Sequence, residues 1–393
     1  MAIFLHIYNK RNGVCFLLKT WIPGETPEKE ELKQQLDVAK KKLYDLQMKI
    51  KEHKIPVLVL FEGWSAAGKG SMIGKVIKNI DPRFFKVATM SAPSEEELRR
   101  PFLYRYMCQI PEQGKFTFLD AGWMEQTTQE VLNKKLEGED YEKRIESIRR
   151  FERQLTDNGY LVLKFFMHID KEEQKERMNR LCASKDTRWR VSDFDKWQQE
   201  HYHKCEKVYD RYLKDTNAST SPWYIIDAKD KKWAELQVMD TLVSSIEVAL
   251  QNQSHSVPIL QNVFPLVKMP KLKDIELTGK TIDDEEYEKE LKKLQDKLSE
   301  LHNRLYRARI PVIITYEGWD AAGKGGNIKR ITGALDPRGY EVHPIASPEP
   351  HEKARHYLWR FWTRLPKDGH IAIFDRTWYG RVMVERLEGF CSE

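Results

Sequence analysis

The sequence Phe61-Glu-Gly-Trp-Ser-Ala-Ala-Gly-Lys-Gly70 recurs in nearly the same form as Tyr316-Glu-Gly-Trp-Asp-Ala-Ala-Gly-Lys-Gly325. An apolar run typical of a strand precedes each stretch (residues 55–60 and 310–315), and a pattern typical of a helix follows it. This is the context of a phosphate-binding P-loop, because backbone N–H groups of the glycine-rich turn and the helix N-terminus surround phosphate oxygens. The sequence therefore predicts two such loops.

The predicted phosphate-binding residues are the glycines and the lysine of each loop. They are Gly318, Gly323, Lys324 and Gly325 in the second copy, and Gly63, Gly68 and Lys69 in the first. In both copies a glycine follows the lysine, where the usual motif has the Ser or Thr that binds magnesium. The ordinary hydroxyl ligand of the metal is therefore missing from both loops.

A constant spacing relates the two copies. Gly318 minus Gly63 gives 255, and the same offset relates further landmarks without a gap. These landmarks are Asp81-Pro82-Arg83 with Asp336-Pro337-Arg338, residues 118–120 with 373–375, and an apolar stripe at helical spacing, Leu36, Ala39, Leu43, Leu46 and Ile50 with Leu291, Leu294, Leu298, Leu301 and Leu305. The offset indicates a tandem duplication, and the stripe indicates helix packing.

Strand-like and helix-like segments alternate through the first copy, with few hairpin signals. This order predicts an α/β fold in which helices cover both faces of a parallel sheet, a three-layer arrangement. We expect a first domain at residues 1–251, a linker at 252–273 and a second domain at 274–393. Within the first domain the expected segments include helices at 27–54 and 95–107, one long helix that ends near 156, and strands at 116–120, 160–169 and 223–227.

The second copy is predicted to be truncated. Subtracting 255 from 393 gives 138, so counterparts of residues 139–251 are missing from it. A sheet without these segments exposes an edge and an apolar face. We therefore expect the sequence to be a fragment of a longer protein, and residues 1–393 alone to be inactive.

Composition narrows the class of protein. The net charge of +6, from 66 basic and 60 acidic residues, is typical of a solvated surface, and we predict no nucleic-acid partner. Five cysteines are scattered without a C-x-x-C pair, which is typical of reduced thiols. No run approaches the ~20 apolar residues of a membrane span. We predict a cytoplasmic protein without a membrane partner, and its oligomeric state, a homo-oligomer included, stays open.

Charged residues of the second copy point to phosphate chemistry. Asp375 ends the apolar run 371–375, and a carboxylate at the end of a strand beside a P-loop is the Walker B solution for holding magnesium. Arg376 and Arg381 follow and are able to clamp phosphates. Asp320 lies inside the loop, where a negative charge is reasonable only beside a metal ion or a substrate proton. The open alternatives are that Asp375 caps a helix and that the arginines form surface salt bridges.

Taken together, the motifs resemble the polyphosphate kinase 2 family. The resemblance rests on Gly318–Gly325, Tyr357–Trp362, Leu365-Pro366, Phe374–Arg381, Val384-Glu-Arg386 and Glu388-Gly-Phe390. The tandem arrangement is similar to the two-domain branch of this family, the polyphosphate:AMP phosphotransferases. The resemblance implies a P-loop kinase-like fold, magnesium dependence, and transfer of a phosphoryl group from inorganic polyphosphate to a nucleotide, with AMP to ADP as the expected reaction.

The resemblance also implies residue roles. Asp320 and Asp375 would hold the metal and organise the acceptor phosphate. Lys324, Arg376 and Arg381 would neutralise the transferring group and the polyphosphate. Phosphoryl transfer needs little beyond such positioning and charge neutralisation.

The first copy departs from this charge set. Three of the five counterparts are uncharged: Ser65 for Asp320, Ala121 for Arg376 and Gln126 for Arg381. Only Lys69 and Asp120 are kept. We therefore predict that the second copy is catalytic and that the first is a structural or binding partner.

Two other functions remain open from the sequence. One is an ATP-dependent kinase of ordinary P-loop type that acts on a nucleotide or another small molecule. The other is a non-catalytic phosphate-binding scaffold. The sequence also leaves open whether AMP or ADP is the acceptor, which polyphosphate chain length is preferred, and whether the first copy binds a ligand.

Overall fold

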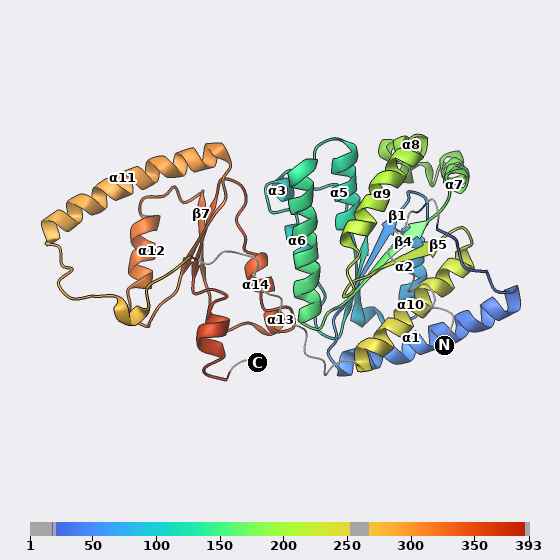
Figure 1. The fold of residues 1–393 in the computed structure, drawn as a ribbon, viewed down its shortest axis with the longest axis horizontal. Helices are drawn as coiled ribbons and strands as arrows, with labels where there is room; N and C mark the ends of the chain where they lie inside the picture. The colour runs from blue at the N-terminus through green and yellow to red at the C-terminus, as the bar shows by residue number, and fades with distance from the viewer. Residues whose placement is uncertain (1–17, 19–20, 252–266, 390–393) are drawn as a thin grey trace. The chain divides into compact units, whose positions relative to one another are not determined.

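The computed structural model describes residues 18, 21–251 and 267–389 (Figure 1). The described chain forms two compact units. The first contains described residues of the ranges 1–92, 105–255 and 354–356, and the second contains those of 93–104, 256–353 and 357–393. None of the helices in these described parts combines the length and the apolar character that crossing a bilayer requires.

The sheet of the first unit is fully parallel, as the alternation of strands and helices predicts. Its spatial order is β2-β3-β1-β4-β5. The strands are β1 (Val57–Gly63), β2 (Phe85–Thr89), β3 (Phe116–Asp120), β4 (Leu161–His168) and β5 (Trp223–Asp227). The central strands β1 and β4 are buried on both faces, which explains their almost continuous apolar sequences.

Helices cover both faces of this sheet (Figure 1). On one side lie α1 (Lys29–Glu52), α2 (Lys69–Ile77) and α10 (Lys231–Gln251), and on the other lie α5 (Trp123–Leu132), α6 (Gly138–Asp157) and α9 (Tyr202–Thr216). Two shorter elements, α7 (Lys171–Ala183) and α8 (Asp193–Glu200), lie between β4 and α9 in sequence. The predicted three-layer architecture is confirmed.

Two expected helices are each broken in two. The long helix expected to end near residue 156 is instead α5 and α6, because Lys134 between them and Gly138 at the start of α6 adopt left-handed backbone, with φ of 55° and 54°. The helix expected at 95–107 is α3 (Glu95–Leu98) and α4 (Tyr104–Met107). Pro101 lies between them and disfavours helical geometry at the residue before it.

The second unit repeats three of the five strands of the first sheet. Its strands β6 (Val312–Tyr316), β7 (Tyr340–Pro344) and β8 (Ile371–Asp375) are parallel in the order β6-β8-β7, which matches β1-β3-β2. Its helices include α11 (Asp284–Ala308), α12 (Lys324–Thr332), α13 (Pro350–Lys353) and α14 (Trp359–Trp362). Alternate residues of β8 face two separate apolar clusters, one with Ile328 and the other with Phe361.

The helix that precedes each loop is covered to different extents in the two copies. On α1 the stripe residues Ala39 and Leu46 are 1% and 6% exposed, because α1 packs against α10. Their counterparts on α11, Leu294 and Leu301, are 60% and 42% exposed. Among the described residues the second unit has no counterpart of β4, β5 or α10. Of the predicted linker, residues 252–266 lie outside the described residues, as does Phe390 of the family motifs.

Candidate functional site

Both predicted loops have the same backbone. Gly323 precedes α12 with φ of 87°, and Gly68 precedes α2 with φ of 96°. These left-handed values favour glycine, because a Cβ would crowd the backbone there. Gly63 has a second reason to be glycine, since a Cβ on it would lie 2.4 Å from the carbonyl oxygen of Met167. Each loop therefore leads into the N-terminus of a helix, as a phosphate-binding loop requires.

A cavity of about 510 Å³ opens beside the loop of the second copy. It is lined by the loop and by the ends of two strands: Ala321, Ala322, Gly323, Lys324, Gly325, Pro344, Ile345, Ala346, Asp375 and Arg376. Five of the predicted site residues therefore meet in one cavity. The residues 344–346, at the end of β7, were not predicted to belong to the site.

Strand pairing brings Asp375 to the loop. In the parallel register of β6 and β8, Asp375 lies opposite Tyr316, the last residue before the loop sequence Glu317-Gly-Trp-Asp320. The backbone N–H of the next residue, Arg376, donates to the carbonyl oxygen of Tyr316 at 3.0 Å. The predicted Walker B position of Asp375, at the end of a strand beside the loop, is thus what the fold produces.

Gly318 and Asp320, also predicted for this copy, do not line the cavity. Lys324 Nζ donates to the carbonyl oxygens of Gly318 and Trp319, both at 2.9 Å, so Gly318 contributes its backbone. Asp320 is 95% exposed at its side chain and lies 3.4 Å from a guanidinium nitrogen of Arg376. It is a neighbour of the cavity rather than part of its lining.

Arg381 is not brought into the cavity lining. Its guanidinium pairs with Glu385 one helical turn later, at 2.5 Å, and lies 5.4 Å from the ring centroid of Tyr357. For Arg381, this geometry matches the alternative of a surface salt bridge that the sequence left open. Arg376, in contrast, lines the cavity.

Glu317 was not among the predicted site residues, although it lies in the second loop motif, residues 316–325. Its Oε1 accepts hydrogen bonds from the backbone N–H of Thr377 at 2.7 Å and from the Thr377 hydroxyl at 2.6 Å. Thr377 is nearly fully buried. The carboxylate therefore ties the end of β6 to the turn after β8.

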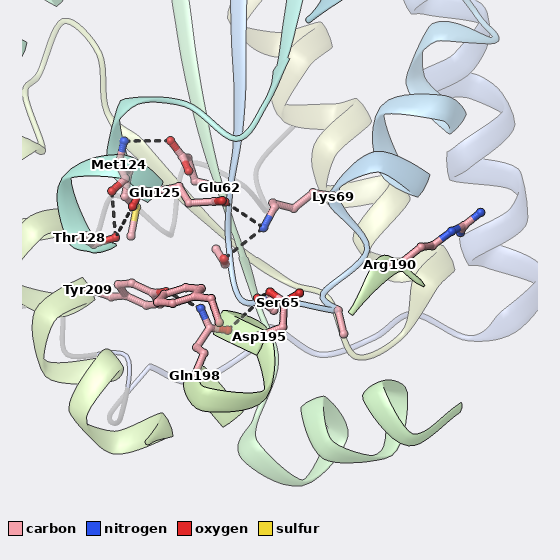
Figure 2. Close-up of a pocket in the computed structure, with 13 residues that line it drawn as sticks. Glu62, Ser65, Lys69, Met124, Glu125, Thr128, Arg190, Asp195, Gln198 and Tyr209 are labelled. Atoms are coloured by element: carbon pink, nitrogen blue, oxygen red, sulfur yellow. Dashed lines mark hydrogen bonds and ion pairs between the residues drawn. The ribbon is translucent and has the colours of Figure 1, made fainter. Parts of the chain in front are cut away.

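The loop of the first copy lines a smaller cavity, of about 180 Å³ (Figure 2). Three acidic side chains line it, Glu62, Glu125 and Asp195, together with Lys69. Lys69 Nζ lies 3.6 Å from Glu125 Oε2 and 3.4 Å from the carbonyl oxygen of Gly63. Burial acts to lower the pKa of Lys69, but the surrounding carboxylates, Glu125 first, raise it above its ordinary value. The positive charge of this lysine is thus already balanced by nearby carboxylates of the protein.

Two side chains of helix α8 form hydrogen bonds with Ser65 of the first loop. The Ser65 hydroxyl donates to Asp195 Oδ1, and the Ser65 backbone N–H donates to Gln198 Oε1 at 2.9 Å. Figure 2 shows both α8 side chains directed at the loop. Arg177 of α7 donates to the carbonyl oxygen of Ala67 at 3.1 Å. Backbone groups of this loop are therefore held by side chains of the same unit.

Glu62 of the first copy corresponds to Glu317 but lies in a different environment. It is 1% exposed, and burial, helped by the charge of Glu125, raises its pKa from 4.5 to about 8. Its Oε1 accepts from the backbone N–H of Met124 at 3.0 Å, while its Oε2 has no hydrogen-bond partner. A buried carboxyl group in this setting keeps its proton at neutral pH.

The carboxylates of the second copy fit a hard cation. Magnesium prefers oxygen ligands and is often held by one or two carboxylates together with substrate phosphates and water. Asp375 offers such an oxygen in the cavity beside Lys324, and Asp320 offers a second near its rim. The described residues contain no group of three or more His, Cys, Asp or Glu suited to a metal ion.

Comparison with known proteins agrees with this arrangement. A family profile described as polyphosphate kinase 2 matches residues 26–254 and 281–393, which is most of the chain and both copies. The chain belongs to the polyphosphate kinase 2 family. Members of this family are kinases that generally depend on a divalent metal ion.

Relatives of similar sequence carry the name polyphosphate:AMP phosphotransferase. A polyphosphate:AMP phosphotransferase of Pseudomonas aeruginosa is 33% identical over 376 residues, 94% of this chain and 75% of that protein. Another, from Pseudomonas syringae pv. tomato, is 35% identical and covers 86% of this chain and 69% of its own length. The crystal structure of a protein described as a putative polyphosphate kinase 2 from Pseudomonas aeruginosa superimposes with a TM-score of 0.78 at 33% identity, over 94% of this chain and 73% of that one. The fold and the family that the motifs indicated are confirmed.

Proposed function

We propose that this protein transfers the terminal phosphoryl group of inorganic polyphosphate to AMP and so forms ADP. In this reaction a terminal P–O–P bond of polyphosphate breaks, and a phosphate oxygen of AMP forms the new bond to phosphorus. The observation that carries the proposal is the cavity of the second copy, in which Lys324, Asp375 and Arg376 meet at the N-terminus of α12. The names of the relatives, polyphosphate:AMP phosphotransferases, supply the donor and the acceptor.

Each residue of this cavity has a role in the proposal. Backbone N–H groups at the start of α12 and the ammonium of Lys324 bind the phosphate oxygens. Arg376 neutralises the transferring group through bidentate hydrogen bonds. Arg381 acts further out, on the polyphosphate chain, after releasing Glu385. These residues position and neutralise, which is most of what phosphoryl transfer needs from a protein.

Magnesium is the proposed metal, with Asp375 as its main protein ligand and Asp320 as the second. When bound, it supplies charge neutralisation at the phosphate oxygens. Asp320 also lies close enough to Arg376 to hold the guanidinium at the rim of the cavity, 3.4 Å away.

The first copy is proposed to be a structural domain without phosphoryl transfer. Its loop lysine, Lys69, faces Glu125 and further carboxylates, and its Ser65 is bonded to α8. Binding a polyanion there would place negative charge beside Glu125 and Asp195, which is unfavourable. The phosphate-binding role expected for Gly63, Gly68 and Lys69 is therefore proposed only for their second-copy counterparts.

The chain is proposed to act in the cytoplasm, where polyphosphate and nucleotides would meet it. Among the described cysteines, Cys182 and Cys205 are reduced thiols, consistent with a reducing compartment.

The test is the formation of ADP from AMP, polyphosphate and magnesium without ATP, by the purified product of the complete reading frame. We expect turnover that stops when magnesium is chelated. ADP formation that requires ATP would identify an ordinary nucleotide kinase instead. Binding of polyphosphate without any turnover would identify a phosphate-binding scaffold.

A further inference from the structure

We propose that Glu317 is a positioning residue that presents Arg376 to the phosphate site. This rests on the proposed function of the second copy. Glu317 does not touch the reacting atoms in the proposal. It holds the backbone of the turn after β8, and the guanidinium of Arg376 is delivered as a consequence.

The backbone of Arg376 needs such support. Its φ of 68° lies in the left-handed region, where an L-residue with a long side chain is uncommon. Residues held in this region are found at functional sites when the surrounding structure fixes them. The conformation aims the side chain of Arg376 at the cavity, where it lines the wall and approaches Asp320.

Consecutive residues at the end of β6 fix this conformation. Tyr316 accepts the N–H of Arg376 through its carbonyl oxygen, at 3.0 Å. Glu317 then accepts both the N–H and the hydroxyl of Thr377 on a single oxygen, Oε1. The Thr377 hydroxyl in turn accepts from the N–H of Tyr379 at 3.2 Å. Hydrogen bonds therefore hold the peptide group before Arg376 and the peptide group after it.

The first copy provides an internal comparison. Ala121 repeats the left-handed turn with φ of 64°, and its N–H donates to Phe61 at 3.2 Å. Gly122 replaces the threonine, and a Cβ on it would lie 2.8 Å from Glu62 Oε1. Without a hydroxyl in between, Glu62 reaches the N–H of Met124 directly.

The turn therefore forms without arginine and without threonine. The hydroxyl contact to the carboxylate is present in the copy that carries the arginine and replaced in the copy that does not. We therefore assign the Glu317–Thr377 pair to the placement of the Arg376 side chain. The pair is not required for the turn itself, because the first copy forms the turn without it.

Two alternative roles give different results on substitution. If Glu317 only stabilised the fold, its loss would act independently of Arg376. If Glu317 were a metal ligand or a proton acceptor, replacing its charge would be as harmful as removing the side chain. Because Oε1 takes both donors of Thr377, glutamine, which keeps an amide oxygen there, preserves the positioning contact.

The experiment compares Glu317→Ala, Glu317→Gln and Thr377→Val in the product of the complete reading frame. Tripolyphosphate binding by calorimetry and steady-state kinetics with AMP are both measured. We expect Glu317→Ala to lower kcat/KM for polyphosphate by roughly 10- to 100-fold, the effect of misplacing a catalytic group. Glu317→Gln should stay within about threefold of the original protein, and Thr377→Val should fall between them, with Thr377→Ser restoring function.

The decisive arm is a double-mutant cycle with Arg376→Ala. If Glu317 acts through the arginine, adding Glu317→Ala to Arg376→Ala causes no further loss of tripolyphosphate affinity or of turnover. Full additivity, or a Glu317→Gln variant as defective as Glu317→Ala, would overturn the proposal. If Glu317→Ala fails to fold by circular dichroism, the Thr377→Val and Thr377→Ser pair carries the same cycle. Glu62→Gln, the matched change in the first copy, should leave kinetics unchanged.

The cycle also separates this inference from the proposed function. A protein that makes no ADP but binds tripolyphosphate through Arg376 would contradict the proposed reaction, and the coupling in affinity would still support or refute the role of Glu317. A protein that neither binds tripolyphosphate nor makes ADP would overturn both.

Discussion

The hydroxyl of Ser65 donates a hydrogen bond to the carboxylate of Asp195, two residues that lie 130 positions apart in the chain. This contact fastens α8 onto the first loop at the position where the second loop carries Asp320. A loop that is bonded in this way, and whose lysine faces Glu125, is poorly suited to an incoming phosphate. The asymmetry between the two copies leads to the first prediction.

Replacing the two loop lysines should have unequal effects. Lys324→Ala is expected to lower kcat/KM by roughly 10²- to 10³-fold, because it removes a charge that faces the phosphates. Lys69→Ala should leave the kinetics of the folded protein nearly unchanged, although it leaves Glu125 without its partner and lowers stability. Steady-state kinetics and thermal unfolding of both variants check this. Equal kinetic losses would show that the first copy is also an active site.

Removing the charge of either site carboxylate should stop transfer without unfolding the protein. Asp375→Asn is expected to reduce turnover by two or more orders of magnitude, because the amide is a much weaker ligand for magnesium, and Asp320→Asn should also be defective. ADP formation at saturating and at low magnesium, with circular dichroism as the folding control, gives the measurement. Near-normal activity of Asp375→Asn would remove this residue from the metal site.

The stability of the first unit should fall as pH rises. Glu62 has a pKa raised to about 8 by burial, against 4.5 ordinarily, so the folded state binds its proton more tightly than the unfolded state. Its contribution is complete below about pH 4.5 and is lost as pH approaches 8, at up to about 1.4 kcal/mol per pH unit. Urea unfolding of the protein and of Glu62→Gln between about pH 5 and 8 tests this. The variant should lose this part of the slope, and identical slopes would show that Glu62 ionises normally.

Glycine is required more strictly in the first loop than in the second. A Cβ at Gly63 would lie 2.4 Å from the Met167 carbonyl oxygen, whereas a Cβ at Gly318 meets nothing within 4 Å. Both have positive φ, so both alanine variants carry backbone strain of about 1–3 kcal/mol. We expect Gly63→Ala to lower the free energy of unfolding by clearly more than Gly318→Ala does. A larger loss for Gly318→Ala in the same denaturation experiment would contradict this.

Local sequence was sufficient to predict where the two loops lie and that Asp375 lies beside the second one. A P-loop consists of consecutive residues, and the parallel order β6-β8-β7 places the end of β8 beside it. The closure of the first loop could not be predicted, because Asp195 and Gln198 reach Ser65 from a distant helix whose docking depends on tertiary packing. For Arg381 the sequence left a surface salt bridge open as an alternative to phosphate binding, and only the structure shows the pairing with Glu385 one turn along.

The repeated left-handed turn has a consequence for how the two copies differ. Ala121 and Arg376 hold nearly the same φ, 64° and 68°, although one side chain is a methyl group and the other a guanidinium. The two copies therefore differ in chemistry at this position without a difference in backbone conformation. Exchanging the two residues would alter the charge beside each loop while asking no new conformation of the turn.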